Sequence, residues 1–118
     1  MKKSRRAKAC DISHKTKAML FARDGGCIFC QMGYHPPEEP QTMFDAMHYI
    51  PRSLGGLGTI QNSAIGCRYH HQMMDQGSDG RRPEMLALFR KYLQGQYFDW
   101  EESKLTYQRE IGGVRYGK

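Results

Sequence analysis

The apolar positions of this chain fall into short groups separated by glycine and proline, a pattern that predicts short helices and strands. Ser13 can cap a helix over residues 14–23, which has one apolar side, and Gly25 and Gly26 would end it. A polar loop with three prolines follows and fits neither a helix nor a central strand.

Beyond this loop the pattern predicts two extended pieces and then two helices. Residues 44–50 favour a short strand, and a second extended piece is expected around residues 63–66, after a glycine-rich loop. Residues 68–76 predict a short helix, and residues 84–94 predict a longer one whose apolar stripe is expected in the core. Together these elements predict an α+β fold.

The net charge of +6 is concentrated at the N-terminus. Residues 1–26 carry eight Lys and Arg against two Asp, so the rest of the 118 residues is neutral on balance. Such a basic arm, without an amphipathic apolar face beside it, favours nucleic acid over a membrane, although a solvated tail accounts for the charge equally well. We expect residues 1–12 to be a disordered arm and residues 13–118 a single domain. The arm residues expected to contact nucleic acid are Lys2, Lys3, Arg5 and Arg6.

Neither a secretory signal nor a membrane span is visible in the sequence. The N-terminal residues are charged and lack an apolar core, and no apolar run has the length of a membrane-spanning helix. We therefore expect a cytoplasmic protein without a membrane partner, in which cysteines are reduced.

Four side chains have the composition and spacing of a structural zinc site. Cys27-x-x-Cys30 and Cys67-x-x-His70 repeat one two-residue gap, which lets each pair face a single ion. A redox Cys-x-x-Cys pair lacks its usual βαβ context, and unrelated buried cysteines leave the repeated spacing unexplained. Cys10, the remaining cysteine, is expected to play no part.

A second group of residues lies between the two halves of this zinc motif. The run Met47-His48-Tyr-Ile-Pro-Arg-Ser-Leu-Gly-Gly-Leu-Gly58, then Gln61-Asn62, then Cys67-Arg-Tyr-His-His71 and Asp75, resembles the HNH endonucleases, in particular the small zinc-bearing ones of phages and prophages. The resemblance covers about residues 23–78. It implies a ββα-metal (His-Me finger) core over about residues 44–78, stapled by the structural zinc and flanked by helices.

The resemblance also implies a role for each matching residue. His48 matches the histidine that acts as general base on water, and Asn62 matches the residue that bonds to the loop backbone and helps to aim that histidine. His71 matches the ligand of a catalytic divalent ion such as Mg²⁺ or Mn²⁺. Asp75, one helical turn later, is expected to be a second ligand or to orient His71.

Two positions depart from the family pattern. Met47 stands where many members have an Asp or His metal ligand, and Asp45, two residues earlier on the same strand face, is the candidate replacement. His70 stands where the family zinc site usually has cysteine, although the paired spacing still favours His70 on zinc.

Other residues have less specific roles. Arg52 and Arg68 are expected to contact backbone phosphates beside the cut, although a lone surface arginine is more often only a solvated charge. The glycines at positions 55, 56 and 58 resemble a phosphate-cradling loop weakly, and a turn that brings the backbone close to DNA accounts for them as well.

Two functions remain open. The resemblance implies a DNA endonuclease with structural Zn²⁺ and a catalytic divalent ion, encoded by a phage or prophage and acting in a bacterial host cell. Phage terminase and packaging proteins would then be possible partners. The alternative is a catalytically degenerate module that binds zinc and nucleic acid, in which Met47 in place of a metal ligand has abolished binding of the catalytic ion. We prefer the enzyme, because a binding module gives no reason for His48, Asn62 and His71.

Overall fold

The computed structural model describes residues 3–76, 80–111 and 114–116. It shows a small α+β protein whose main sheet has two antiparallel strands. None of the helices in these ranges has the length and apolar character needed to cross a membrane. The helices and strands, with short 3₁₀ turns written η, are α1 (Arg5–Cys10), α2 (His14–Asp24), α3 (Ile28–Gln31), β1 (Phe44–His48), η1 (Arg52–Leu54), η2 (Ile60–Asn62), β2 (Ser63–Cys67), α4 (Arg68–Gln76), α5 (Arg82–Gln96), η4 (Glu102–Lys104), β3 (Arg109–Ile111) and β4 (Val114–Tyr116).

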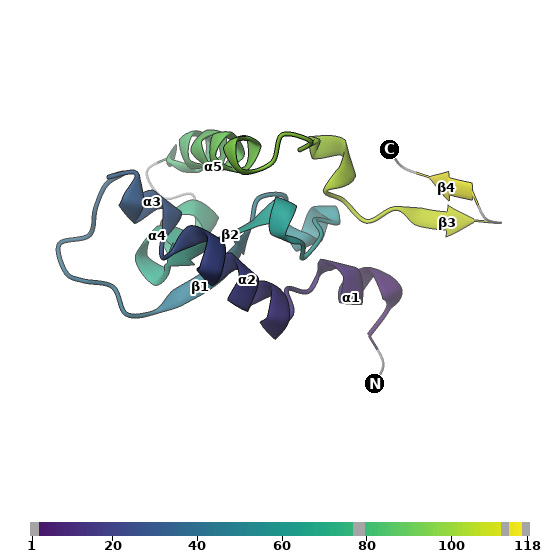
Figure 1. Ribbon diagram of the computed structural model, residues 1–118, viewed down its shortest axis with the longest axis horizontal. Coiled ribbons are helices and arrows are strands. Elements are labelled where there is room, and N and C mark those ends of the chain that lie inside the picture. Colours follow the sequence, from purple (N-terminus) through teal and green to yellow (C-terminus); the bar gives the residue numbers. More distant parts are fainter. Residues whose placement is uncertain (1–2, 77–79, 112–113, 117–118) are drawn as a thin grey trace.

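The central unit is the β1–β2 pair, which continues directly into α4. The register pairs Phe44 with Cys67 and His48 with Ser63, so β2 ends where α4 begins. Every residue of β2 is buried, because α2, α3 and α4 all pack against this strand. In Figure 1, α5 runs along one long side of the molecule, and the β3–β4 hairpin lies at the end away from the loop before β1.

The helix ends follow from local chemistry. Ser13 caps α2 by accepting a hydrogen bond from the Thr16 amide at 3.0 Å, as the sequence predicts. Gly25 ends α2 in the left-handed conformation at φ +72°, where a side chain would be strained. The last helix, α5, extends two residues beyond the predicted range at each end and includes Gly95.

The N-terminal arm differs from the expectation of disorder. Residues 5–10 form α1, which Ser4 caps by accepting from the Ala7 amide at 3.0 Å. Its last residue, Cys10, is buried rather than a bystander in a solvated tail. The charge composition predicted a disordered tail because composition does not show which parts of the fold the arm packs against.

The core lies between the sheet and the helices around it. The apolar stripe predicted for residues 84–94 supplies Met85, Phe89 and Leu93, all fully buried. From the strands, Met47 and Ala64 join the same cluster, and this burial explains why position 47 carries an apolar residue.

Candidate metal centre and active site

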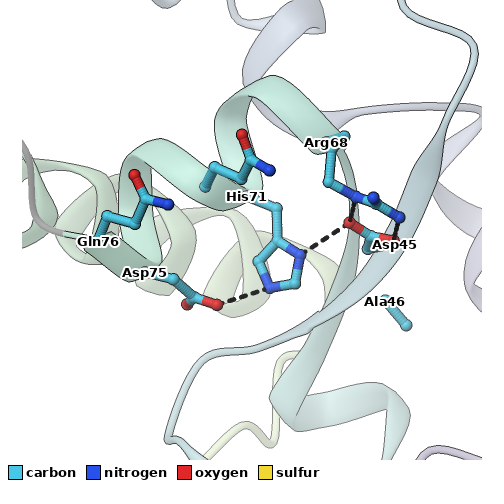
Figure 2. Close-up of a pocket in the computed structure, with 7 residues that line it drawn as sticks. Asp45, Ala46, Arg68, His71, Asp75 and Gln76 are labelled. Carbon is cyan, nitrogen blue, oxygen red and sulfur yellow. Dashed lines mark hydrogen bonds and ion pairs between the residues drawn. The ribbon is translucent and has the colours of Figure 1, made fainter.

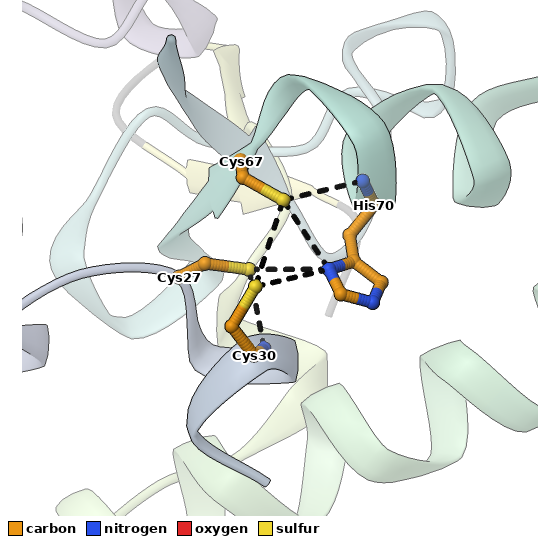
Figure 3. A group of neighbouring side chains, drawn as sticks. All are labelled: Cys27, Cys30, Cys67 and His70. Carbon is orange, nitrogen blue, oxygen red and sulfur yellow. Dashed lines mark hydrogen bonds between the residues drawn. The ribbon is translucent and has the colours of Figure 1, made fainter. Parts of the chain in front are cut away.

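Three elements bring the predicted zinc ligands together. Cys27 is the N-cap residue of α3 and Cys30 lies within this helix. Cys67 is the last residue of β2, and His70 lies in the first turn of α4. Figure 3 shows the four side chains pointing toward one another. Their ligand atoms all lie within 4.8 Å of one another, so the four residues predicted from the sequence form one cluster.

The spacing within the cluster fits tetrahedral zinc. Zn–S bonds of about 2.3 Å and a Zn–N bond of about 2.0 Å would place two sulfurs about 3.8 Å apart and sulfur about 3.5 Å from nitrogen. The Cys30 and Cys67 sulfurs are 3.8 Å apart. The His70 Nδ1 atom lies 3.5 Å from the sulfurs of Cys27 and Cys30 and 3.3 Å from that of Cys67. The cluster could therefore hold a zinc ion.

The surroundings prepare His70 and Cys27 for a cation, whereas burial raises the pKa values of the Cys30 and Cys67 thiols. The His70 Nε2 atom lies 2.7 Å from the Tyr34 carbonyl, which can only accept, so Nε2 carries the proton and Nδ1 faces the sulfurs with its lone pair. Burial raises the pKa of the Cys27 thiol, but the contact with the His70 ring and hydrogen bonds from backbone amides outweigh this and lower that pKa overall. A thiolate is the form that binds zinc.

A second candidate site is a pocket on the exposed side of α4, next to β1. Its lining includes Asp45, Arg68, His71 and Asp75, and its volume is about 530 Å³. Figure 2 shows the His71 ring between two carboxylates, with Asp45 on one side and Asp75 on the other. The His71 Nδ1 atom is 2.9 Å from Asp45 Oδ2, and its Nε2 atom is 3.1 Å from Asp75 Oδ2. Each ring nitrogen of His71 therefore has its own acidic neighbour.

Asp45 is held in place on the Nδ1 side. Arg68 donates to both of its oxygens, from Nε at 2.8 Å and from Nη2 at 3.0 Å. These hydrogen bonds, which outweigh the effect of burial, and the contact with His71 hold the pKa of Asp45 at about 2. An ion at Nε2 of His71 would lie away from Asp45. Asp45 as a metal ligand in place of Met47 stays a prediction; in the structure both of its oxygens accept from Arg68, and one of them lies beside His71 Nδ1.

His48 lies at the end of β1 and is not among the residues that line the His71 pocket. Its Nε2 atom is 2.7 Å from the carbonyl oxygen of Cys10, the last residue of α1. Burial lowers the pKa of His48, the contact with Cys10 opposes this, and the charge of Arg52 lowers the pKa further. The ring is therefore neutral near pH 7, as a general base must be.

Asn62 is buried and bonds to the backbone of the loop after β1, as the resemblance implies. Its Oδ1 accepts from the Ile50 amide at 2.8 Å, and its Nδ2 donates to the carbonyls of Ile50 at 3.1 Å and Leu57 at 2.8 Å. One side chain thus ties two points of the loop to η2: Ile50, which lies two residues after His48, and Leu57.

The glycine-rich loop packs closely against its own chain at two of its glycines. A Cβ on Gly56 would lie 1.7 Å from the Ile50 carbonyl oxygen, and one on Gly58 would lie 2.0 Å from the Asp11 carbonyl oxygen. These two positions require glycine for intramolecular contact.

Three of the predicted DNA-contacting residues are paired with aspartates, and two are exposed on α1. Arg52 and Lys3 both pair with Asp11, and Arg68 is paired with Asp45. Arg5 and Arg6 are exposed on α1, where the Arg6 guanidinium also donates to the carbonyls of Arg52 at 3.3 Å and Ser53 at 3.4 Å. Lys2 lies outside the described residues.

The sequence analysis missed a buried polar network around Arg23 and Asp24. The two form an ion pair at 2.6 Å, and Asp24 also accepts from the Ile65 amide at 2.8 Å and from the Tyr92 hydroxyl. Arg23 donates to the carbonyls of Ile60 at 2.6 Å and Ser63 at 2.7 Å. The only signal in the sequence was an adjacent arginine and aspartate at the end of a helix with one apolar side.

Comparisons with known proteins identify no relative: no family model, no curated protein and no solved structure matches this chain.

Proposed function

We propose that the protein is a zinc-stabilised, metal-dependent endonuclease of the HNH type that hydrolyses phosphodiester bonds in DNA. The observation that carries this proposal is the pairing of His71 Nε2 with Asp75 at 3.1 Å in an open pocket. Ligands at about 2.1 Å on adjacent positions of an octahedral Mg²⁺ would be about 3 Å apart.

The charges around His71 add support. Asp45 can only accept, so in the neutral ring the proton lies on Nδ1 and the Nε2 lone pair faces the carboxylate of Asp75. Two electron-rich atoms at this distance repel each other unless a positive charge lies near them, and Arg82 supplies part of that charge at 3.7 Å from Asp75 Oδ1. A divalent cation held by His71 and Asp75 would supply the rest, and in the reaction it would offset the negative charge on the phosphate.

The residues of the chain would perform the remaining steps. His48 takes a proton from water, the water oxygen bonds to phosphorus, and the bond from phosphorus to the 3′ oxygen breaks, with that oxygen taking a proton from solvent. Asn62 holds the loop that follows His48, and Asp45 orients His71. The order β1, loop, β2 and α4 is the order that a ββα-metal core requires, which supports the assignment of these roles.

DNA is the proposed substrate because of the charge that surrounds the loop after β1. The exposed basic residues of α1 lie against this loop through the contacts of Arg6. They would meet the phosphate backbone without reading bases, and binding would weaken as the salt concentration rises.

Two observations favour the degenerate binding module as a second candidate. Met47 is fully buried and offers no ligand, and His48 does not line the pocket of His71. In that case the chain would bind zinc and DNA without cutting.

Cleavage of supercoiled plasmid distinguishes the two candidates. The wild type is expected to cut with Mg²⁺ or Mn²⁺, and His48→Ala and His71→Ala are each expected to lose at least about 100-fold in rate. His14→Ala, at an exposed position, is the matched control and should cut normally. Each variant is first checked for bound zinc. A zinc-loaded wild type that binds DNA but cuts with neither metal would contradict the nuclease and favour the binding module.

A further inference from the structure

The four residues of the candidate zinc cluster differ in how far they are shielded from solvent. Cys27, Cys67 and His70 are buried, whereas Cys30 is partly exposed. Cys67 and His70 belong to β2 and α4, which pack against each other in the middle of the fold. Cys30 belongs to the short helix α3, and the largely exposed residues 32–43 follow it. One sulfur of the cluster is therefore more accessible than the other two.

An open pocket leads to this sulfur. Its volume is about 500 Å³, and its lining includes Cys30, the two glycines that follow α2, residues 37–41 and Phe44. A water molecule occupies about 30 Å³ in the liquid, so there is room for a small oxidant such as hydrogen peroxide beside Cys30. The oxidant can reach the cluster without unfolding of the chain.

A second cysteine sulfur lies within reach of Cys30. The Cys67 Sγ atom is 3.8 Å from the Cys30 Sγ atom (Figure 3). A disulfide bond is about 2.05 Å long, so the two sulfurs would have to approach each other by about 1.8 Å. When they bind zinc, both residues are thiolates, which is the form that attacks peroxides and oxidised sulfur. An oxidised Cys30 therefore has a partner beside it.

We propose that Cys30 is an oxidation site through which hydrogen peroxide opens the zinc cluster. The Cys30 thiolate attacks one peroxide oxygen, the O–O bond breaks, and the leaving hydroxide takes a proton, which leaves a sulfenic acid at Cys30. The Cys67 thiolate then attacks the Cys30 sulfur. The S–S bond forms, the S–O bond breaks, and the second hydroxide also takes a proton. The two thiolates lose two electrons, and the peroxide is reduced to two waters.

This disulfide removes two of the four ligands, so the cluster releases its metal. The cluster joins α3 to β2 and α4, and α4 also carries His71. Oxidation at Cys30 would therefore loosen the helix that lines the second pocket, and a thiol reductant with added Zn²⁺ would restore it. The inference goes beyond the proposed nuclease function and does not depend on it, because it requires only the cluster and its zinc.

The first test follows zinc release from the full-length, zinc-loaded protein after hydrogen peroxide is added. A chromogenic chelator measures the zinc, and mass spectrometry of alkylated peptides identifies the disulfide. We expect one zinc released per disulfide, a Cys30–Cys67 bond, and recovery with dithiothreitol and Zn²⁺. Zinc release while Cys30 stays reduced, or a disulfide that lacks Cys30, would overturn the proposal. A Cys27–Cys30 bond would overturn the step assigned to Cys67, and a chain that binds no zinc would overturn the whole proposal.

A substitution tests the importance of the accessible sulfur. Cys30→His keeps a ligand for zinc but removes this sulfur, so zinc release by peroxide is expected to slow about tenfold or more. Cys10→Ser is the control, since it removes a buried cysteine outside the cluster and should release zinc at the wild-type rate. Equal rates in Cys30→His and the wild type would contradict the proposal.

Limited alkylation tests the same point if Cys30→His does not bind zinc. The zinc-loaded wild type is treated with less than one equivalent of iodoacetamide, and the labelled peptide is identified. The first label is expected on Cys30, because exposure decides which thiolate reacts. A first label on Cys27 or Cys67 would overturn the proposal.

Discussion

The protonation states of Asp45 and His48 each depend on a few neighbouring groups. Asp45 has both oxygens bonded to Arg68 and one near His71, so its charge is fixed in the folded protein. His48 is buried enough to be neutral, and a backbone carbonyl determines which nitrogen carries its proton. At this scale the structure adds to Asp45 and His48 the partners that set their protonation.

Replacing Asp45 should change how stability depends on pH. Its pKa is about 2 in the folded protein and about 3.9 in an unfolded chain. The carboxylate therefore adds to the free energy of unfolding above about pH 4, and this contribution is lost as the pH falls toward 2. Asp45→Asn is expected to unfold with about 1 kcal/mol less free energy at pH 7, since the pair with Arg68 is partly exposed.

Urea titrations of wild type and Asp45→Asn at several pH values test this expectation. The difference in unfolding free energy should be constant from pH 7 to 5 and narrow below pH 4. Asp99→Asn, at an exposed position, is the control and should match the wild type. A difference that widens on acidification would contradict the stabilising role of the carboxylate.

The pH profile of cleavage should reflect the lowered pKa of His48. A free histidine becomes protonated below about 6.5, whereas burial of His48 shifts its protonation to lower pH. Since the neutral ring is the base, kcat/KM should be flat near pH 7 and fall on the acid side only below pH 6.5. Rates measured from pH 5 to 8 give the midpoint, and an acid limb centred above 6.5 would speak against His48 as the base.

Residue spacing in the sequence predicted the zinc cluster because each ligand pair is local. Two residues separated by a short turn face one point, so Cys27 and Cys30 or Cys67 and His70 come together in almost any fold. The partners of His71 were predictable from strand and helix periods only as candidates. Which of Asp45 and Asp75 faces which ring nitrogen depends on how α4 crosses β1, and one sequence does not contain that information.

Among the elements, the loop between β1 and η2 connects the most functional groups. Asn62 bonds to its two ends, Gly56 lies against its start, and α1 packs on its outer side. Glycine and proline predicted a loop here, but the contact with α1 could not be predicted, because it joins segments more than forty residues apart.

Asn62→Asp is expected to destabilise this loop. The substitution keeps the acceptor for the Ile50 amide but places a charged oxygen against the carbonyls of Ile50 and Leu57, 3.1 and 2.8 Å from the present Nδ2. Loss of two buried hydrogen bonds and the repulsion should lower the free energy of unfolding by about 3 kcal/mol. Gln61→Glu adds the same charge at the preceding, half-buried position and should cost much less in urea unfolding. Equal costs for the two variants would contradict a specific role for Asn62.

For the molecule as a whole, two polar clusters join elements that a small core would hold only weakly. The Cys27–Cys30–Cys67–His70 cluster connects α3 with β2 and α4, and the Arg23–Asp24 network connects α2 with η2, β2 and α5. The first was visible in the sequence as a spacing motif. The second was not, because an arginine and an aspartate side by side are common on surfaces.

Zinc removal is therefore expected to unfold the protein. Cys30→Ser should bind less than one zinc per chain and lose most of its thermal stability, because zinc binding contributes directly to folding in such sites. Cys10→Ser removes the cysteine outside the cluster and should keep one zinc per chain. Metal analysis and thermal unfolding with and without a chelator measure both effects. A wild type that keeps its melting temperature after complete zinc removal would contradict this role.

The proline-containing segment between α3 and β1 has a consequence for engineering. Most of residues 32–43 are exposed and form neither helix nor strand, while Cys30 and Cys67, which enclose this segment, meet in one cluster. Doubling the length of such a loop costs only about 0.6 kcal/mol of closure entropy. A foreign domain inserted within residues 36–42, clear of Tyr34 and its contact with His70, would leave the Cys27–Cys30–Cys67–His70 cluster intact, so this part of the segment offers a graft point for a DNA-reading domain.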